Sequence, residues 1–347
     1  MILGGSGVPL SQKLSRVPLT DRSSLKGVTG ILIASLRLLD KVHVGSGEFN
    51  LIVSDWNAVK RLSQEVLASK AIERVGAQAV NLMSISLKFT RVGQKVCIPG
   101  SAIKGVIRTR LELMAGKRGS GNVTSVCLSF ARPRMKGLPA PGSQGWRHAR
   151  IWGLTVLVDR EPESYLEEEQ IFELCPVCNL FGAPGTASRV LFSDMCCDNC
   201  STQMCAISEY NMRVDVLPPG TMLKSSIVLR GVTVEELGLL IIGMGFDGIN
   251  FKPILIGRMK YSCEGMGKAV FSIEKLRVAT YSLDYIKGLG VSIKQSTEGF
   301  VIEGEELKKL INVAFSKARE RYPDVEPFSE AEEKENLSSQ LNLVRCI

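Results

Sequence analysis

The chain has little histidine and no long hydrophobic run. His43 and His148 are the only histidines among its 347 residues, so general acid–base chemistry has few candidates, and no Ser/His/Asp motif is present. The longest apolar stretch, residues 237–246, contains three glycines and is far shorter than the ~20 residues of a membrane span. Residues 1–16 lack the charged and apolar regions of a secretory signal. These absences predict a cytoplasmic protein without a membrane partner.

Acidic residues are scarce in the first half of the chain. Residues 1–160 carry 24 Lys and Arg against 8 Asp and Glu, whereas residues 161–347 carry 19 against 27, so the net charge of +8 combines halves of +16 and −8. Within residues 91–160 only Glu112 and Asp159 oppose thirteen basic side chains. This concentration of charge is typical of a polyanion site, with nucleic acid as the first candidate. A solvated basic face, or docking to an acidic subunit, is the alternative.

A helix that begins with cationic side chains is predicted after Pro99. Ser101 is a suitable N-cap. Apolar residues recur at helical spacing, namely Ile103, Ile107, Leu111 and Met114. Lys104 and Arg108 lie on a separate stripe, and Gly105 would let a partner approach the backbone. Because the free N–H groups of a helix start bind anions, the segment is predicted to bind a phosphate group. A surface helix with scattered basic residues is the alternative.

The order of predicted elements favours an α+β fold, because strands and helices follow one another without regular βαβ spacing. Residues 1–24 are expected to form a flexible basic arm, 25–325 one domain, and 326–347 a polar acidic tail. Insertions are expected at about 48–90, 117–150 and 195–216. Among the expected elements are strands at about 30–39, 84–89, 151–158, 222–230 and 270–277, and helices at 57–75, 161–174 and 234–244.

Ten cysteines in a chain without a secretory signal favour metal binding or buried thiols over structural disulfides. Cys175 and Cys178 are followed by Cys197 and Cys200 in the pattern C-x2-C-x18-C-x2-C, which suits a tetrahedral four-thiolate site. Soft thiolates select zinc or an iron–sulfur cluster, and a structural zinc is the preferred interpretation. Other candidate ligands are Cys196, Cys205 and His148. Buried cysteines without a metal are the alternative.

Several segments, taken in order, resemble the RAMP proteins of CRISPR effector complexes, and within them the type III subunits. These segments are the loop 42–47 (VHVGSG), the helix start 98–105 (IPGSAIKG), 175–182 (CPVCNLFG), 188–194 (SRVLFSD), 217–221 (LPPGT) and the glycine loop 257–267. The resemblance implies a ferredoxin-like (RRM-like) βαββαβ core with large insertions, here with a zinc-binding loop. It also implies assembly with other RAMP and effector subunits along a CRISPR guide RNA that pairs with target RNA.

The resemblance also implies which residues contact the guide RNA. The helix start and the glycine loop would hold phosphates. The glycines of the loop 42–47 suit close approach of a ligand, and His43 there is expected to pack in the protein or to stack on RNA. The residues concerned are His43, Gly45, Ser101, Lys104, Gly105, Arg108, Arg258, Lys260 and Lys268. Contacts of this kind position RNA without reading its sequence.

Backbone subunits of this family carry an aspartate that cleaves target RNA with a divalent metal such as Mg²⁺ or Mn²⁺, and Asp55 could fill that role. Matching backwards from the Pro-Gly-Ser turn instead sets residues 76–81 at the cleavage position, where no aspartate occurs. An aspartate before a predicted helix is also a common N-cap. The segment between Asp194 and Pro218 is short and cysteine-rich, whereas backbone subunits have a long hairpin there. This favours a divergent or terminal subunit.

Three functions follow, of which the first is the leading hypothesis and the other two are alternatives. The first is a non-catalytic RAMP subunit that binds guide RNA and neighbouring subunits. The second is a metal-dependent endoribonuclease of the same architecture that uses Asp55. The third is a free-standing, zinc-stabilised RNA-binding protein.

Overall fold

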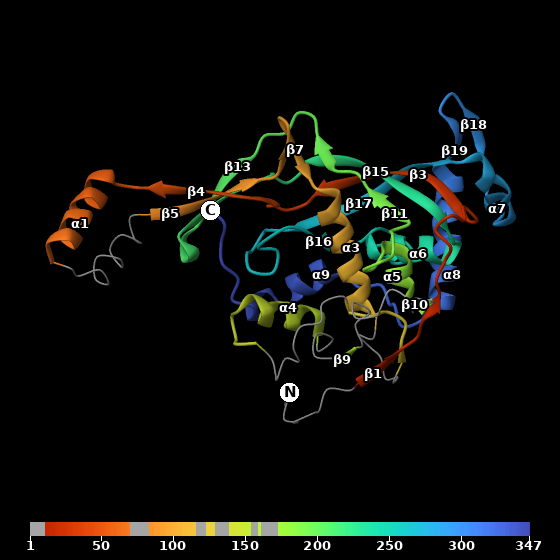
Figure 1. Cartoon of the computed structure of the whole chain (residues 1–347), viewed down its shortest axis with the longest axis horizontal. Coiled ribbons are helices and arrows are strands. Elements are labelled where there is room, and N and C mark those ends of the chain that lie inside the picture. Colours follow the sequence, from red (N-terminus) through yellow and green to blue (C-terminus); the bar gives the residue numbers. More distant parts are fainter. Residues whose placement is uncertain (1–10, 70–82, 116–122, 129–138, 154–158, 161–172) are drawn as a thin grey trace.

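The computed structural model describes residues 11–69, 83–115, 123–128, 139–153, 159–160 and 173–347. Within these residues the chain is a mixed α+β protein built on a ten-stranded sheet, drawn across the top of Figure 1 with several helices beneath it. The sheet runs, in spatial order, β18 (Lys294–Ser296), β19 (Gly299–Glu303), β17 (Lys268–Val278), β3 (Val28–Leu38), β15 (Met222–Val232), β12 (Met195–Cys197), β7 (Lys95–Ile98) and β6 (Arg91–Val92). Two further strands, β11 (Val190–Phe192) and β16 (Ile254–Leu255), pair with β15 and β17.

Three strands of eleven residues, β3, β15 and β17, form the centre of this sheet. Both neighbours pair with β3 in antiparallel register, β15 from Met222 opposite Arg37 and β17 from Ala269 opposite Leu38. Along β15 buried and more exposed side chains alternate, which is the pattern of a strand with one face on a core. Their length and pairing make these strands the frame of the domain.

The connections between these strands follow the order of a split β-α-β unit. Strand β3 leads to helix α3 (Gly100–Met114), then to β11 and β12, to β15, to helix α6 (Val234–Gly243) and to β17. In space β17 and β15 flank β3, and β11 and β12 pair with the far side of β15. The pattern is therefore β-α-β-β-α-β with the spatial order 4-1-3-2, interrupted by long insertions.

Most of the helices lie on one side of the sheet, whereas α1 lies away from it (Figure 1). The other helices are α1 (Trp56–Ser69), α4 (Gln144–Trp152), α5 (Pro176–Phe181), α7 (Leu283–Gly288), α8 (Gly304–Arg321) and α9 (Glu330–Asn336), with 3-10 turns η4 (Ser208–Tyr210), η5 (Thr280–Ser282) and η6 (Ser338–Gln340). The apolar stripe predicted for α3 is buried, as expected, beneath the sheet (Figure 1). No helix in the described ranges is long and apolar enough to cross a membrane.

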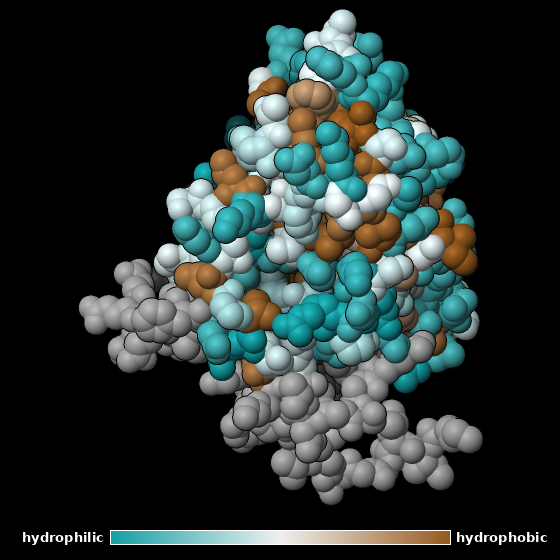
Figure 2. Space-filling model, turned by 90° about the vertical axis from the view of Figure 1, so that its right-hand side faces the viewer, coloured by the Kyte–Doolittle hydropathy of each residue, from teal (hydrophilic) through white to brown (hydrophobic). Residues whose placement is uncertain are grey.

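A second sheet, in the order β13 (Gln203–Ile207), β14 (Met212–Val216), β5 (Met83–Phe89) and β4 (Gly45–Val53), joins two segments that were expected as separate insertions. Its β4 and β5 strands extend away from the main body and end at α1, at the left of Figure 1. Paired residues at the outer end form an apolar face, and Phe49 and Leu51 are 65% and 55% exposed there. The opposite end of the molecule, seen in Figure 2, shows hydrophobic side chains in small groups among hydrophilic ones.

Both ends of the chain differ from the loose segments that were expected. Residues 11–24 include β1 (Ser11–Leu14), which pairs with β8 (Val123–Thr124) and β9 (Asp159–Arg160), and β2 (Val17–Pro18), which pairs with β10 (Glu173–Leu174). Leu14 belongs to the core. In the expected acidic tail, Ala331 and Leu341 are buried, and Glu330 reaches Arg110 in a buried ion pair. These segments contain few apolar residues, but strand pairs and an ion pair with distant residues hold the segments in place.

The expected strand at 151–158 is wrong at its start, because Ile151 and Trp152 end helix α4. Ser143 caps this helix by accepting a hydrogen bond from the Trp146 N–H, and Ile151 and Trp152 pack into the core from its last turn. Residues 154–158 and most of the expected helix at 161–174 lie outside the described residues. Local capping therefore overrides the β-preferring residues that suggested a strand.

We expect opposite effects from alanine at the two glycines of α3. A Cβ at Gly100 would overlap the carbonyl oxygen of Phe192, whereas nothing lies within 4 Å of a Cβ at Gly105. Gly100→Ala should therefore destabilise the fold by about 1–3 kcal/mol, as overpacking does. Gly105→Ala should stabilise it by about 0.5–1 kcal/mol, because glycine is a poor helix former. Urea unfolding measures both, and equal midpoints for the two variants would contradict the packing described.

Candidate nucleic-acid interface and metal centre

The N-cap of helix α3 lies two residues before the predicted one, and a distant carboxylate completes the helix start. Pro99 occupies the N-cap position and offers no side-chain hydrogen bond, so Ser101 is not the cap. Instead the Gly100 N–H donates to Asp194 Oδ1 at 2.8 Å, from the turn between β11 and β12. A carboxylate at this place satisfies a free N–H and the positive end of the helix dipole. Asp194 was not foreseen as a functional residue, although it ends one of the motifs.

Beyond this contact the surface of α3 is open. Ser101 and Gly105 are exposed, Lys104 is half-buried, and the space above Gly105 is free. Burial lowers the pKa of Lys104, and the neighbouring Arg108 lowers it further. A phosphate near Lys104 would offset both effects, since it brings a negative charge to a cation that has a cationic neighbour. The part of the helix start that can accept an anion is therefore the turn from Ser101 to Gly105, with Asp194 filling the first position.

In the loop 42–47 the glycines are exposed and the histidine is buried. His43 is 0% exposed, its Nδ1–H donates to the Asp215 carbonyl at 2.6 Å, and its ring lies edge-on to Phe89. Burial lowers the pKa of His43. His43 therefore supports the loop from inside and is not placed to stack on RNA, whereas Gly45 is exposed.

The glycine loop lies directly against this histidine loop. The Arg258 N–H donates to the His43 carbonyl at 2.8 Å, and a Cβ at Gly257 would overlap that carbonyl. The Thr90 N–H bonds to the Val44 carbonyl, and the Cys97 N–H bonds to the Thr90 carbonyl, which links both loops to the strand that enters α3. Backbone hydrogen bonds thus join the two loops to each other and connect them, through Thr90, to the strand that precedes the helix start.

Lys260 in the glycine loop and Lys268 directly after it point away from this surface. Lys260 donates to the Leu255 carbonyl at 3.2 Å and lies over the Tyr261 ring. Burial lowers its pKa to about 8. Lys268 pairs with Glu335 of α9. Arg258, by contrast, is exposed. Among the predicted RNA contacts of this loop, Arg258 is the residue that faces solvent.

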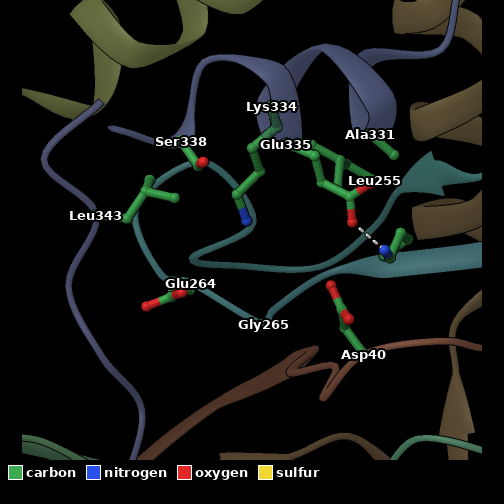
Figure 3. Close-up of a pocket in the computed structure, with 10 residues that line it drawn as sticks. Asp40, Leu255, Glu264, Gly265, Ala331, Lys334, Glu335, Ser338 and Leu343 are labelled. Atoms are coloured by element: carbon green, nitrogen blue, oxygen red, sulfur yellow. Dashed lines mark hydrogen bonds and ion pairs between the residues drawn. The ribbon is translucent and has the colours of Figure 1, made fainter. Parts of the chain in front are cut away.

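Lys268 lines a pocket of about 300 Å³ between the glycine loop and α9 (Figure 3). Lys334 points into this pocket and donates to the carbonyls of Cys263 at 2.6 Å and Met266 at 3.1 Å. Burial lowers the pKa of Lys334 to about 8. Because both acceptors belong to the glycine loop, the residues expected as an acidic tail hold that loop from below.

Arg108 has protein partners on all three of its nitrogens. Nε donates to Glu112 Oε1 at 2.8 Å, Nη1 to the Gly182 carbonyl at 2.8 Å, and Nη2 to Cys178 Sγ at 3.0 Å. Burial alone would lower the pKa of Arg108, but Cys178 and the Glu112 carboxylate raise it. The expectation that Arg108 contacts phosphate therefore gives way to a connection between α3 and the cysteines.

Three buried cysteines form a cluster that could hold a metal ion. The Sγ atoms of Cys127, Cys175 and Cys178 all lie within 4.8 Å of one another, with Cys127 at 3.4 Å from Cys178 and 3.5 Å from Cys175. Thiolates bound to one tetrahedral zinc at about 2.3 Å are about 3.8 Å apart, so the donors need little movement to fit. The set is soft and thiolate-only, which suits zinc. Cys127 was missed because it has no neighbouring cysteine in the sequence.

The other half of the predicted ligand set lies elsewhere. Cys197 and Cys200 are bonded to each other in a disulfide at β12, and the described residues do not place them in the cluster. The further candidates are also engaged, since Cys196 bonds Cys97 and Cys205 bonds Cys346. His148 packs against the Tyr261 ring. The second C-x2-C pair follows a strand of the main sheet, whereas the first caps a helix against α3, so the two pairs do not face one centre.

Asp55 is the N-terminal capping residue of α1. Its Oδ1 accepts a hydrogen bond from the Ala58 N–H at 2.9 Å. In Figure 1, α1 lies at the far end of the β4–β5 extension from α3. No group of three or more acidic, histidine or cysteine ligands within the described ranges includes Asp55. These contacts support a capping role and give Asp55 no partner for a divalent ion within those ranges.

Comparisons with known proteins identify a family for about half of the chain. Residues 35–206 match the RAMP superfamily. A chain of a solved structure described as "Type IV-B CRISPR Complex" is 12% identical, with coverage of 70% of this chain and 90% of that chain and a TM-score of 0.34. A similarity at this TM-score is too low to support a conclusion about fold or function. No curated protein matches the chain.

The buried state of His43 predicts a pH dependence of stability. Because burial lowers its pKa below the ordinary value of 6.5, the unfolded chain binds a proton more readily than the folded chain. The contribution of His43 is fully present above pH 6.5 and is lost as the pH falls below that value. Urea unfolding between pH 7.5 and 5.5 should show this decrease, and His43→Asn, which keeps a donor for the Asp215 carbonyl, should reduce it. Identical pH profiles for the two proteins would contradict the prediction.

Asp55 gives a second prediction. Asp55→Ala should speed amide hydrogen exchange in α1, because loss of an N-cap costs about 0.5–2 kcal/mol, whereas Asp55→Asn should retain the cap. Neither change should alter RNA cleavage by an assembled complex that contains the chain. If Asp55→Asn abolished cleavage while α1 kept its protection, Asp55 would be catalytic.

Proposed function

Residues 35–206 match the RAMP superfamily, and from that match we propose that the chain is a non-catalytic, RNA-binding subunit of a CRISPR effector complex. The order of its motifs favours a complex of type III. In this role the chain would hold guide-RNA phosphates and contact neighbouring subunits. The observation that carries the proposal is the open turn from Ser101 to Gly105, whose preceding strand is connected by backbone hydrogen bonds to the loops of the exposed Gly45 and Arg258.

The chemistry of this surface suits a phosphate backbone. Lys104 and Arg258 supply positive charge, and Ser101 supplies a hydroxyl donor. The free space above Gly105 admits a group close to the helix backbone. None of these groups distinguishes one base from another, so the contacts would position RNA while pairing with the guide reads the target. The surplus of basic residues between 91 and 160 would strengthen binding without adding sequence preference.

Purification of the native complex tests the proposal. Co-purifying RNA with a uniform repeat-derived 5′ sequence supports a guide-RNA subunit. RNA of mixed sequence, or none, supports the free-standing RNA-binding protein and contradicts the proposal. A structural zinc at the cysteine cluster is part of the proposed architecture, and the metal content of the same preparation measures it.

Lys104, which is half-buried and near the open helix turn, and Lys268, which is paired, should differ in their effect on RNA affinity. Lys104→Ala should weaken binding of single-stranded RNA and lower the slope of log K against log salt by about 0.7, the value for one lost phosphate contact on a single strand. Lys268→Ala is the matched control, because Lys268 pairs with Glu335 and should contribute little. Fluorescence anisotropy across a salt series measures both. Equal loss in the two variants, or none in Lys104→Ala, would remove Lys104 from the interface.

A further inference from the structure

Arg108 connects the surface proposed to bind RNA with the interior of the protein. It lies one helical turn after Lys104, and its guanidinium turns inward, with the side chain 19% exposed. Glu112, one turn further along α3, accepts from Nε and is itself buried. This ion pair holds the outer edge of the guanidinium, so that its two Nη atoms face α5 and the residue that follows it. The orientation of Arg108 is therefore fixed from both sides.

The atoms that Arg108 reaches belong to the cysteine cluster and its support. Nη2 contacts Cys178 Sγ, and Nη1 contacts the carbonyl of Gly182, which ends the same short helix. Cys178 in turn lies at hydrogen-bond distance from Cys127, and its N–H donates to Cys175 Sγ. A single guanidinium thus fixes one sulfur of the cluster and the helix that carries it.

A metal ion would change the charge that Arg108 meets. Three thiolates around a divalent ion carry a net charge of −1, whereas three thiols without an ion are neutral. Hydrogen bonds from a cation to such a thiolate are strong and sensitive to position. Groups that hold metal ligands from outside the ligand set typically contribute 10–100-fold to metal affinity. Arg108 occupies that place relative to Cys178.

We propose that Arg108 is a positioning residue of a Cys127–Cys175–Cys178 metal centre and that it couples metal occupancy to the RNA-binding turn of α3. The second part rests on the proposed function. A bound ion would draw Arg108 and Cys178 together and fix α3 against α5. Without the ion the pair is weaker, α3 is held less firmly, and Lys104 is less well placed.

Zinc titration of the reduced, full-length chain tests the first part. In competition with a chromophoric chelator, Arg108→Gln and Arg108→Lys should both raise the zinc Kd about 10–100-fold, because lysine keeps the charge but loses the planar fork. Lys104→Gln, one turn away, should leave the Kd unchanged. Cys127→Ser should abolish tight binding and Cys197→Ser should not, since Cys197 lies outside the cluster. Unchanged zinc affinity in both Arg108 variants at a normal urea midpoint would overturn the proposal.

RNA binding with and without zinc tests the coupling. Removal of zinc from the wild type should raise the RNA Kd severalfold, and the same treatment of Arg108→Gln should change it much less, because the connection is already broken. RNA affinity of the wild type that is independent of zinc would overturn the coupling. If the zinc-loaded wild type bound no RNA, the proposed function would fail, and the zinc titration would still decide whether Arg108 serves the metal centre.

Discussion

The contact between Gly100 and the turn after β11 determines how helix α3 is presented. The carbonyl of Phe192 leaves no room for a side chain at Gly100, and Asp194 accepts the first free N–H of the helix. With its start held in this way, α3 sends its apolar stripe into the core. In this orientation of the helix about its axis, Ser101 and Gly105 are exposed and the Arg108 side chain points toward the cysteine cluster. The surface proposed to bind RNA and the cysteine cluster proposed to hold a metal ion thus lie against two faces of one fixed helix.

The basic residues of the chain divide into an inner and an outer group. Arg108, Arg110 and Arg189 are paired with buried or nearly buried carboxylates, of Glu112, Glu330 and Glu236 respectively. Such charges would be costly without their partners, so they are committed to holding elements together. Lys104 and Arg258 keep contact with solvent. The net charge of a segment therefore overestimates the positive charge that it presents to a polyanion. The position of each cation determines whether a polyanion can contact it.

Local patterns in the sequence predicted much of the fold and part of the site. Helical spacing identified α3, and the irregular order of strands and helices predicted the mixed α+β fold. The first C-x2-C pair lies in the cluster that could hold a metal ion, because four residues are enough to define that turn. Cys127 and Asp194 could not be found in this way, since they approach their partners through the tertiary fold alone.

The direction in which long side chains point could not be predicted from the sequence either. Lys260 and Lys268 lie in the expected loop, yet a carbonyl and a carboxylate from other segments draw them inward. His43 is likewise fixed by Asp215, 172 residues away. A motif fixes where the backbone runs, but the partner that a flexible side chain finds depends on residues far along the chain. The resemblance to the family therefore could not indicate which of the predicted RNA contacts are engaged by other parts of the chain.

The central claim is that the turn from Ser101 to Gly105 and the exposed Arg258 loop form the RNA-binding surface. Ultraviolet cross-linking of the native complex, followed by mass spectrometry of the RNA-bound peptides, tests it most directly. The account predicts cross-links in the peptides that contain Lys104 and Arg258, and none in peptides from α9 beneath the glycine loop. Cross-links confined to the β4–β5 extension, or to α9, would contradict it.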